Sequence, residues 1–189
     1  AASFGTALVV TALLPGPVED PAHRPTVYRH ALPGMSLGIL FAATSGALLR
    51  SLRSLLGERE TDRLSYAELD ALAAAVAPGS GGLLALPFFE SGDGEAPGAL
   101  IGLSLGAGRG QVARSLLEGT SFALRDLLTT LDALGNPATE LRTSGGGSRS
   151  SLWQSIAADV CRVPVTPLPF GEAASAGAAL LGAWGAGLL

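Results

Sequence analysis

The sequence predicts an α/β protein in which helices cover the faces of a mixed sheet. In the second half of the chain, helical and strand-like patterns alternate, with a glycine turn between one strand and the next helix. Composition agrees, because 48% of the 189 residues are hydrophobic and only 15% are charged, unlike a disordered chain. The length fits one domain, or one large lobe of a larger protein.

In the first half, apolar runs predict strands and leucines at helical spacing predict helices. Strands are expected over residues 4–14, with an interruption at Gly5-Thr6, and over residues 26–31, 36–42, 83–89 and 99–103. A helix is expected from Ser45 to a stop at Gly57, and a shorter one over residues 66–76. The stripe of the first helix consists of Leu48, Leu49, Leu52, Leu55 and Leu56. Exposed loops are expected over residues 15–25 and 90–98.

The clearest helical pattern lies in the middle of the chain and ends at Gly135-Asn136-Pro137. Its inward residues are Ala113, Leu116, Leu117, Thr120, Leu124, Leu127, Leu128 and Leu131. A strand over residues 140–143, a glycine turn, a helix with Trp153 inward, a strand over 163–166 and a helix over 173–185 follow. The alanine- and glycine-rich tail, residues 171–189, is expected to be a closely packed core helix with Trp184 in or beside the core.

Composition excludes several classes of chemistry. All 12 basic residues are arginine, and without lysine there is no Walker A loop and no Schiff-base site. A net charge of −4 with scattered arginines does not indicate a nucleic-acid partner. Cys161 is the only cysteine, so neither an internal disulfide nor a zinc site with His23 and His30 is expected. A Ser-His-Asp site stays open, although no G-x-S-x-G motif marks one.

One uncharged run, residues 31–49, is long enough in principle to span a bilayer. It contains Pro33, Gly34 and several small polar residues, which favour a buried strand turning into a buried helix. No membrane partner and no signal peptide are therefore expected.

Two turns place small residues at the end of a strand: Gly5-Thr6-Ala7, and residues 144–147 directly before a helix. A glycine loop exposes backbone N–H groups to a ligand, and a helix start favours anions. Each turn is therefore a candidate for binding phosphate or a nucleotide ribose, as in phosphoryl transfer. The structural alternatives are a bulge at the first turn and a plain connection at the second, and the Rossmann spacing G-x-G-x-x-G is absent.

Four stretches in the second half carry a family resemblance: GALIGLSLG, RSLLEGTSFALRDLL, TSGGGSRSSLWQSIAADV and EAASAGAALLGAWGAG. The earlier stretches SFGTALVV, HALPG and LLALPFF fall in the family's order. On these motifs the chain resembles the C-terminal domain of the FGGY carbohydrate kinases, and it looks most like the xylulose kinases among them. The resemblance implies an actin-like ATPase, ribonuclease-H-like fold, with residues 1–189 as the nucleotide-binding second domain of a two-domain sugar kinase.

The resemblance also implies where phosphate would bind. Gly5 and Thr6 match the family's second phosphate loop, with the Thr6 hydroxyl near the γ-phosphate. Ala7 stands where many relatives have a polar residue, so one contact is in doubt. Gly46 matches a nucleotide contact at a helix start. Arg50, one turn further on, lies where glycerol kinases have a polar contact, although a solvated helix arginine is an equal alternative.

Gly145 and Gly146 match the adenosine loop of the family, where the base lies flat on the backbone. Ser150 matches an Asn or Ser near the base, with helix N-capping as the alternative. For Glu118 and Asp159, which lie inside family motifs, structural hydrogen bonding is favoured over catalysis.

The activity implied by the resemblance is transfer of the γ-phosphate of ATP, with Mg²⁺, to a sugar or polyol hydroxyl. The general base, an Asp, is expected upstream of residue 1, and the sugar is expected to be bound mainly by an N-terminal domain absent from the chain. Because the sequence opens at Ala1 inside a strand-like run, we expect a fragment that does not phosphorylate sugars alone.

Alternatives remain open at this point. The family's GERTP-like loop is replaced by FFESGDGEAPGA, which leaves the substrate in doubt and allows a non-catalytic module that binds a nucleotide or a partner. A hydrophobic domain held in an assembly or a membrane is a third interpretation. A cytoplasmic location is expected, and a homodimer is an open option.

Overall fold

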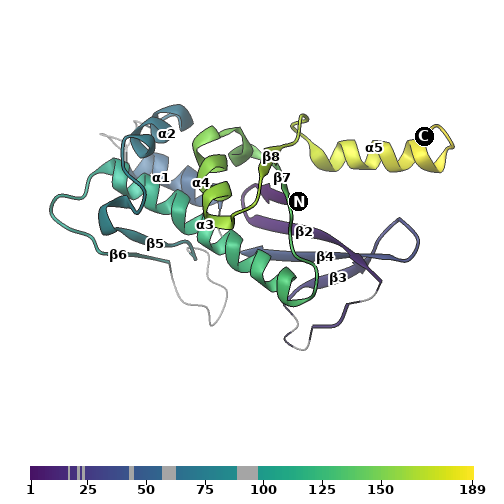
Figure 1. The fold of residues 1–189 in the computed structure, drawn as a ribbon. Coiled ribbons are helices and arrows are strands. Elements are labelled where there is room, and N and C mark those ends of the chain that lie inside the picture. The colour runs from purple at the N-terminus through teal and green to yellow at the C-terminus, as the bar shows by residue number, and fades with distance from the viewer. Residues whose placement is uncertain (17, 21, 23, 43–44, 57–62, 89–97) are drawn as a thin grey trace.

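The computed structural model describes residues 1–16, 18–20, 22, 24–42, 45–56, 63–88 and 98–189. Its main sheet is six-stranded, in the order β3-β4-β2-β1-β7-β8 (Figure 1). These strands are β1 (Ala2–Phe4), β2 (Leu8–Pro15), β3 (Thr26–Arg29), β4 (Met35–Ala42), β7 (Leu141–Ser144) and β8 (Val165–Pro167). β7 runs parallel to both β1 and β8, while the other pairs are antiparallel, so the predicted mixed sheet is confirmed.

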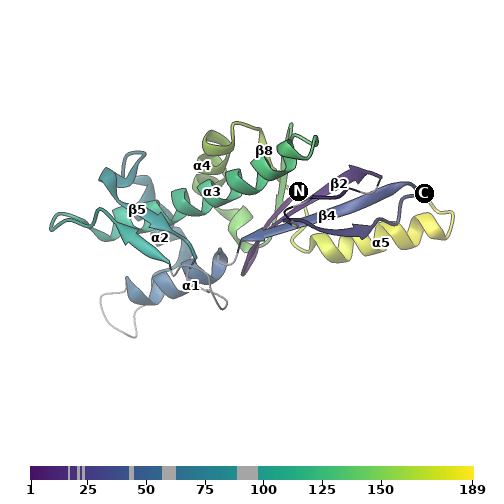
Figure 2. The same cartoon turned by 90° about the horizontal axis from the view of Figure 1, so that it is seen from below.

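A smaller antiparallel sheet pairs β5 (Leu84–Leu86) with β6 (Ala99–Ile101). The helices are α1 (Gly46–Leu55), α2 (Tyr66–Ala74), α3 (Arg109–Ala133), α4 (Ser151–Cys161) and α5 (Ala173–Gly185), with short 3-10 helices η1 (Ser80–Gly82) and η2 (Gly146–Arg149). The long helix α3 crosses the body and packs against α2, α4, β2, β4 and β5 (Figures 1 and 2).

The strand expected over residues 4–14 is in fact a hairpin. β1 and β2 pair antiparallel, with Phe4 opposite Leu8 and residues 5–7 forming the turn. The apolar pattern continues through both strands because both bury alternate residues in one core. The pattern therefore gave the extended conformation correctly and missed the reversal of direction.

The core forms where α3 packs on the sheet, and most of the predicted helical stripes face it. The α3 residues Ala113, Leu116, Leu117, Thr120, Leu124, Leu128 and Leu131 are buried, as expected. In α1, Leu48, Leu49 and Leu52 are buried, but Leu55 is 78% exposed because the helix ends at the edge of the core. The predicted stop at Gly57 and most of the loop at 90–98 lie outside the described residues.

The C-terminal tail contradicts its prediction. α5 has the predicted bounds, but none of its residues is buried, and Trp184 is 48% exposed. Figure 1 shows α5 projecting beyond the β7–β8 end of the body. Apolar composition indicates a preference for burial without specifying a partner, and among the described residues no element covers this helix. The prediction of a packed core helix was therefore wrong.

Residues 31–49 contain the β3–β4 connection, β4 and the first turn of α1, which confirms a strand followed by a helix. The strand is only partly buried, since Phe41 is 66% exposed, so the expectation of a buried strand was wrong in that respect. Within the described part of the chain, no helix combines the length and apolar character needed to cross a membrane.

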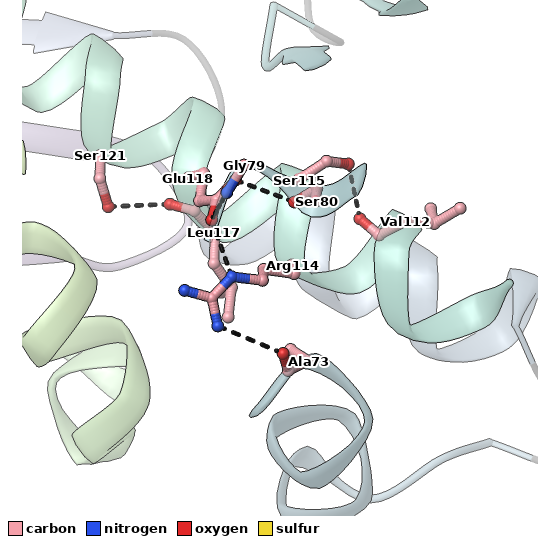
Figure 3. Close-up of polar contacts among 9 residues, drawn as sticks. All are labelled: Ala73, Gly79, Ser80, Val112, Arg114, Ser115, Leu117, Glu118 and Ser121. Atoms are coloured by element: carbon pink, nitrogen blue, oxygen red, sulfur yellow. Dashed lines mark hydrogen bonds and ion pairs between the residues drawn. The ribbon is translucent and has the colours of Figure 1, made fainter. Parts of the chain in front are cut away.

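A buried polar cluster attaches α2 to α3 (Figure 3). The Glu118 carboxylate accepts from Arg114 Nε at 2.7 Å, from Ser80 Oγ at 2.8 Å and from the Gly79 N–H at 3.0 Å. Arg114 in turn donates to the Ala73 carbonyl near the end of α2, at 3.4 Å. The expected structural role of Glu118 is confirmed. Asp159 is exposed on α4, and its side chain makes no hydrogen bond to any described residue, so that expectation was wrong.

We expect Glu118→Ala to lower the free energy of unfolding by about 3–5 kcal/mol, because it leaves the buried Arg114 guanidinium without its anionic partner and removes the acceptor of Ser80 Oγ and of the Gly79 N–H. Urea unfolding of the purified chain measures this change. The exposed pair Glu140–Arg142, at 3.2 Å, supplies the control, and Glu140→Ala should cost no more than about 1 kcal/mol. Equal unfolding midpoints for the two variants would show that the cluster contributes little.

Candidate functional site

A cavity of about 520 Å³ opens where the β1–β2 turn, α1, α2 and the η2–α4 segment meet. Its lining includes every residue that the sequence assigned to the nucleotide except Gly145: Gly5, Thr6, Gly46, Gly146 and Ser150. These residues lie far apart in the chain and on three different connections. The fold therefore brings the two glycine turns to one common cavity.

The start of α1 is bound tightly to the β1–β2 turn. The Gly46 N–H donates to the Gly5 carbonyl at 2.8 Å, and the Ser45 and Ala47 N–H groups donate to the Thr6 carbonyl at 3.2 Å. A Cβ on Gly46 would lie only 2.5 Å from the Gly5 oxygen, so this contact requires glycine. The first N–H groups of α1 are thus occupied by the turn rather than left for an anion.

This arrangement orients the peptide groups of the turn. In a trans peptide the C=O and N–H point in opposite directions. Because the Gly5 and Thr6 carbonyls accept from α1, the N–H groups of Thr6 and Ala7 lie on the side of the turn away from that helix. Arg50, one turn into α1, lines the cavity and donates to Thr6 Oγ1 at 3.3 Å. Arg50 is exposed and also contacts the turn.

The glycine turn after β7 has three different environments at its three glycines. Gly145 has φ 84° and lies against the Phe4 backbone, where a Cβ would approach within 2.9 Å. At Gly147 a Cβ would come within 2.4 Å of the Trp153 ring. At Gly146 nothing lies within 4 Å of the Cβ position, and φ is not in the left-handed region. Packing explains the first and third glycines, while the exposed Gly146 has an open approach from the cavity.

The comparisons with known proteins agree with this arrangement. Residues 1–186 match the family model described as the FGGY family of carbohydrate kinases, C-terminal domain. The chain belongs to the FGGY family of carbohydrate kinases. Its fold is accordingly the actin-like ATPase fold that the sequence predicted.

Individual relatives include both glycerol and xylulose kinases. The chain is 40% identical over 156 residues to a glycerol kinase of Gloeobacter violaceus, covering 79% of this chain and 30% of the relative. It is 30% identical over 168 residues to a xylulose kinase of Staphylococcus epidermidis, covering 85% of this chain and 33% of the relative. The crystal structure of a xylulose kinase from Rhodospirillum rubrum superposes with a TM-score of 0.85 at 35% identity, covering 98% of this chain and 38% of that one. The chain thus spans about a third of the length of the relatives it matches.

In this FGGY domain, Ser150 has a structural role and also lines the cavity. Its side chain accepts from the Trp153 N–H at 3.0 Å and caps α4, which is the alternative that the sequence left open. Trp153 is buried, as predicted, and stacks on Phe4 with ring centroids 4.8 Å apart. The stacked pair forms the floor of the cavity beneath the glycine turn.

Helix α2 forms a wall of the cavity that sequence reasoning missed. Tyr66, Ala67, Leu69 and Asp70 all line the space. Burial raises the pKa of Asp70, and a hydrogen bond with Ser150 acts in the opposite direction. Helical periodicity predicted α2 but could not show that this helix faces the two glycine turns. Among the described lining residues there are two arginines, Arg50 and Arg149, and one carboxylate, which favours an anionic ligand even though the whole chain carries −4.

A second, apolar cavity of about 650 Å³ lies between β5 and α3. Phe41, Phe88 and Phe122 line it, together with Asp126. None of the residues predicted to bind the nucleotide lines it, and the lining residues that the structure describes include no hydroxyl-bearing residue and no arginine. The smaller cavity is therefore the candidate site.

The packing contrast within the glycine turn is testable by unfolding. We expect Gly147→Ala to destabilise the chain by about 1–3 kcal/mol, because the added methyl group would overlap the Trp153 ring and Phe4 Cβ. Gly146→Ala should change stability by no more than about 0.5 kcal/mol. Thermal or urea unfolding of the two variants side by side checks this, and equal losses would contradict the packing described for the turn.

Proposed function

We propose that the cavity binds ATP and that this domain supplies the nucleotide site of a carbohydrate kinase. The observation that carries the proposal is the bare backbone at Gly146, which packing does not require and which opens into a cavity that also contains Thr6 and Arg50. A turn without side chains allows a flat nucleoside to lie on it, while a hydroxyl and a guanidinium suit phosphate oxygens.

The residues of this chain would act by positioning the nucleotide. Arg50 would exchange its bond with Thr6 Oγ1 for bonds to phosphate oxygens, and the Thr6 hydroxyl, which only accepts in the Arg50 bond, would donate its own proton to phosphate as well. The N–H groups on the far side of the β1–β2 turn would add fixed dipoles. Bound ATP supplies the γ-phosphoryl group, and catalysis in such a transfer is mainly positioning and charge stabilisation.

Mg²⁺ belongs to the same proposal, but the described residues of the cavity provide few ligands for it. Among the described residues that line the cavity, Asp70 is the only carboxylate, and it interacts with Ser150. We therefore propose that Mg²⁺ enters on the phosphates of ATP, as this ion commonly does, and that no side chain of the described cavity holds it directly.

The acceptor and the general base complete the proposal. The relatives are glycerol and xylulose kinases, so we propose a sugar or polyol as the acceptor and a cytoplasmic location. Because the chain spans about a third of those relatives, we propose that a separate, sugar-binding domain supplies most acceptor contacts and the base. Closure of two such domains would exclude water from the γ-phosphate.

The first prediction from this proposal concerns the glycine turn. Gly146→Trp should abolish ATP binding, because an indole at this position would fill the space above the turn. Titration of the chain with ATP by calorimetry measures the effect. Gly182→Trp on exposed α5 is the matched control, since its Cβ position is also open and lies outside the cavity. Failure of the unmodified chain to bind ATP, or equal affinity in both variants, would contradict the proposal.

The second concerns the charge at Arg50. We expect Arg50→Gln to weaken ATP binding about tenfold, which corresponds to loss of a charge-assisted hydrogen bond. Adenosine affinity should be unchanged, because adenosine has no phosphate for Arg50 to contact. Parallel titrations with the two ligands separate these effects, and an equal loss for ATP and adenosine would place Arg50 away from the phosphates.

A further inference from the structure

Asp70 on α2 is a cavity residue whose placement no sequence motif indicated. It is half-buried, lines the same space as Gly146 and Thr6, and interacts with the Ser150 side chain. Ser150 is itself held by the Trp153 N–H, since its hydroxyl accepts that bond and can direct its own proton to Asp70. The carboxylate therefore has a fixed neighbour at the α4 side of the cavity.

Contacts at both ends of helix α2 fix its position and therefore the position from which Asp70 extends. A capping box at its start joins Ser65 and Glu68 through bonds of 2.7 and 3.1 Å. Near its end, the Ala73 carbonyl accepts from Arg114, which belongs to the buried cluster on α3. Leu69, next to Asp70, is 1% exposed and anchors the helix in the core. Asp70 thus extends from a helix that is held at its start, at its end and by the core.

The charges in the cavity are separated. Arg50 lies beside Thr6, whereas Asp70 lies beside Ser150. Arg149 also lines the space, but the end of its side chain reaches to 3.9 Å from the Cβ position of Gly171, toward the β8–α5 connection. A carboxylate repels phosphate, so a bound nucleotide would place its triphosphate at Arg50 and its uncharged nucleoside near Asp70.

We propose that the Asp70 carboxylate accepts a hydrogen bond from the exocyclic amino group of the base, so that it selects 6-aminopurine over 6-oxopurine nucleotides. The inference rests on the proposed nucleotide site. An ionised carboxylate can only accept hydrogen bonds. Adenine presents an N–H donor at position 6, whereas hypoxanthine presents an oxygen there, and two acceptors facing each other cannot bond. Burial of Asp70 makes a donor from the ligand more valuable than it would be in water.

ITP is the appropriate competitor, because it has an oxygen in place of the 6-amino group and a proton on the neighbouring N1, and keeps the same ribose and phosphates. We expect the unmodified chain to bind ATP about tenfold more tightly than ITP. Asp70→Asn should bring the two affinities to within about twofold, since the amide can either donate or accept. Asp159→Asn, on the exposed face of α4, is the matched control and should leave the ratio unchanged.

A third ligand, 2′-deoxy-ATP, separates recognition of the base from recognition of the ribose. The ratio of ATP affinity to 2′-deoxy-ATP affinity should be the same in the unmodified chain and in Asp70→Asn. If this ratio changes while the ATP-to-ITP ratio does not, Asp70 contacts the ribose and the inference is wrong. Equal affinity of the unmodified chain for ATP and ITP would also overturn it while leaving the proposed ATP site in place.

Two further outcomes are distinguishable. Absence of ATP binding to the unmodified chain would overturn the proposed function, and this inference with it. Urea unfolding of each variant reports folding, and Asp70→Ser serves as a second variant if Asp70→Asn is unfolded. The serine side chain is too short to reach the base in the same way, so it should also reduce the ATP-to-ITP ratio; an unchanged ratio would contradict the inference.

Discussion

The candidate site depends on the close approach of three backbone segments around the end of β1. The Gly5 carbonyl lies 2.8 Å from the Gly46 N–H on one side, and the Phe4 backbone lies against Gly145 on the other. Neither contact leaves room for a Cβ. Because β1 pairs with both β2 and β7 in the middle of the sheet, this junction is fixed by sheet hydrogen bonds as well as by packing. The cavity is therefore built from main chain at its centre and side chains at its walls.

The stacked rings of Phe4 and Trp153 also determine how the glycine turn is oriented. Phe4 and Trp153 stack beneath the glycine turn, and Trp153 contacts the place where Gly147 would carry a side chain. With Gly145 and Gly147 held against these groups, the chain has to turn Gly146 outward. Core packing thus decides which backbone atoms face the cavity, and the same ring pair that stabilises the fold sets the shape of the site.

Many of the helices, strands and turns could be predicted from local sequence, because glycines, prolines and apolar periodicity act over a few residues. The α3 stripe and the bounds of α5 followed from spacing alone. Burial of α5 did not follow, since apolar composition does not specify a partner. The β1–β2 reversal was missed because both strands share one apolar pattern, and the α2 wall was missed because its orientation depends on Arg114 and Glu118, far away in sequence. Local signals predict elements and turns, whereas non-local contacts determine which of them meet.

The absence of lysine gives this arrangement a consequence for phosphate recognition. With arginine as the only strong cation, charge at the cavity is supplied by a planar guanidinium that is already bonded to Thr6 Oγ1. That bond places the exposed Arg50 side chain beside the turn, where it would exchange Thr6 Oγ1 for phosphate oxygens. The bonded N–H groups of α1, the turn that they orient and the arginine one helical turn later therefore lie together at one part of the cavity. The fixed part of this group is the main chain, which the Gly5–Gly46 contact holds at the end of β1.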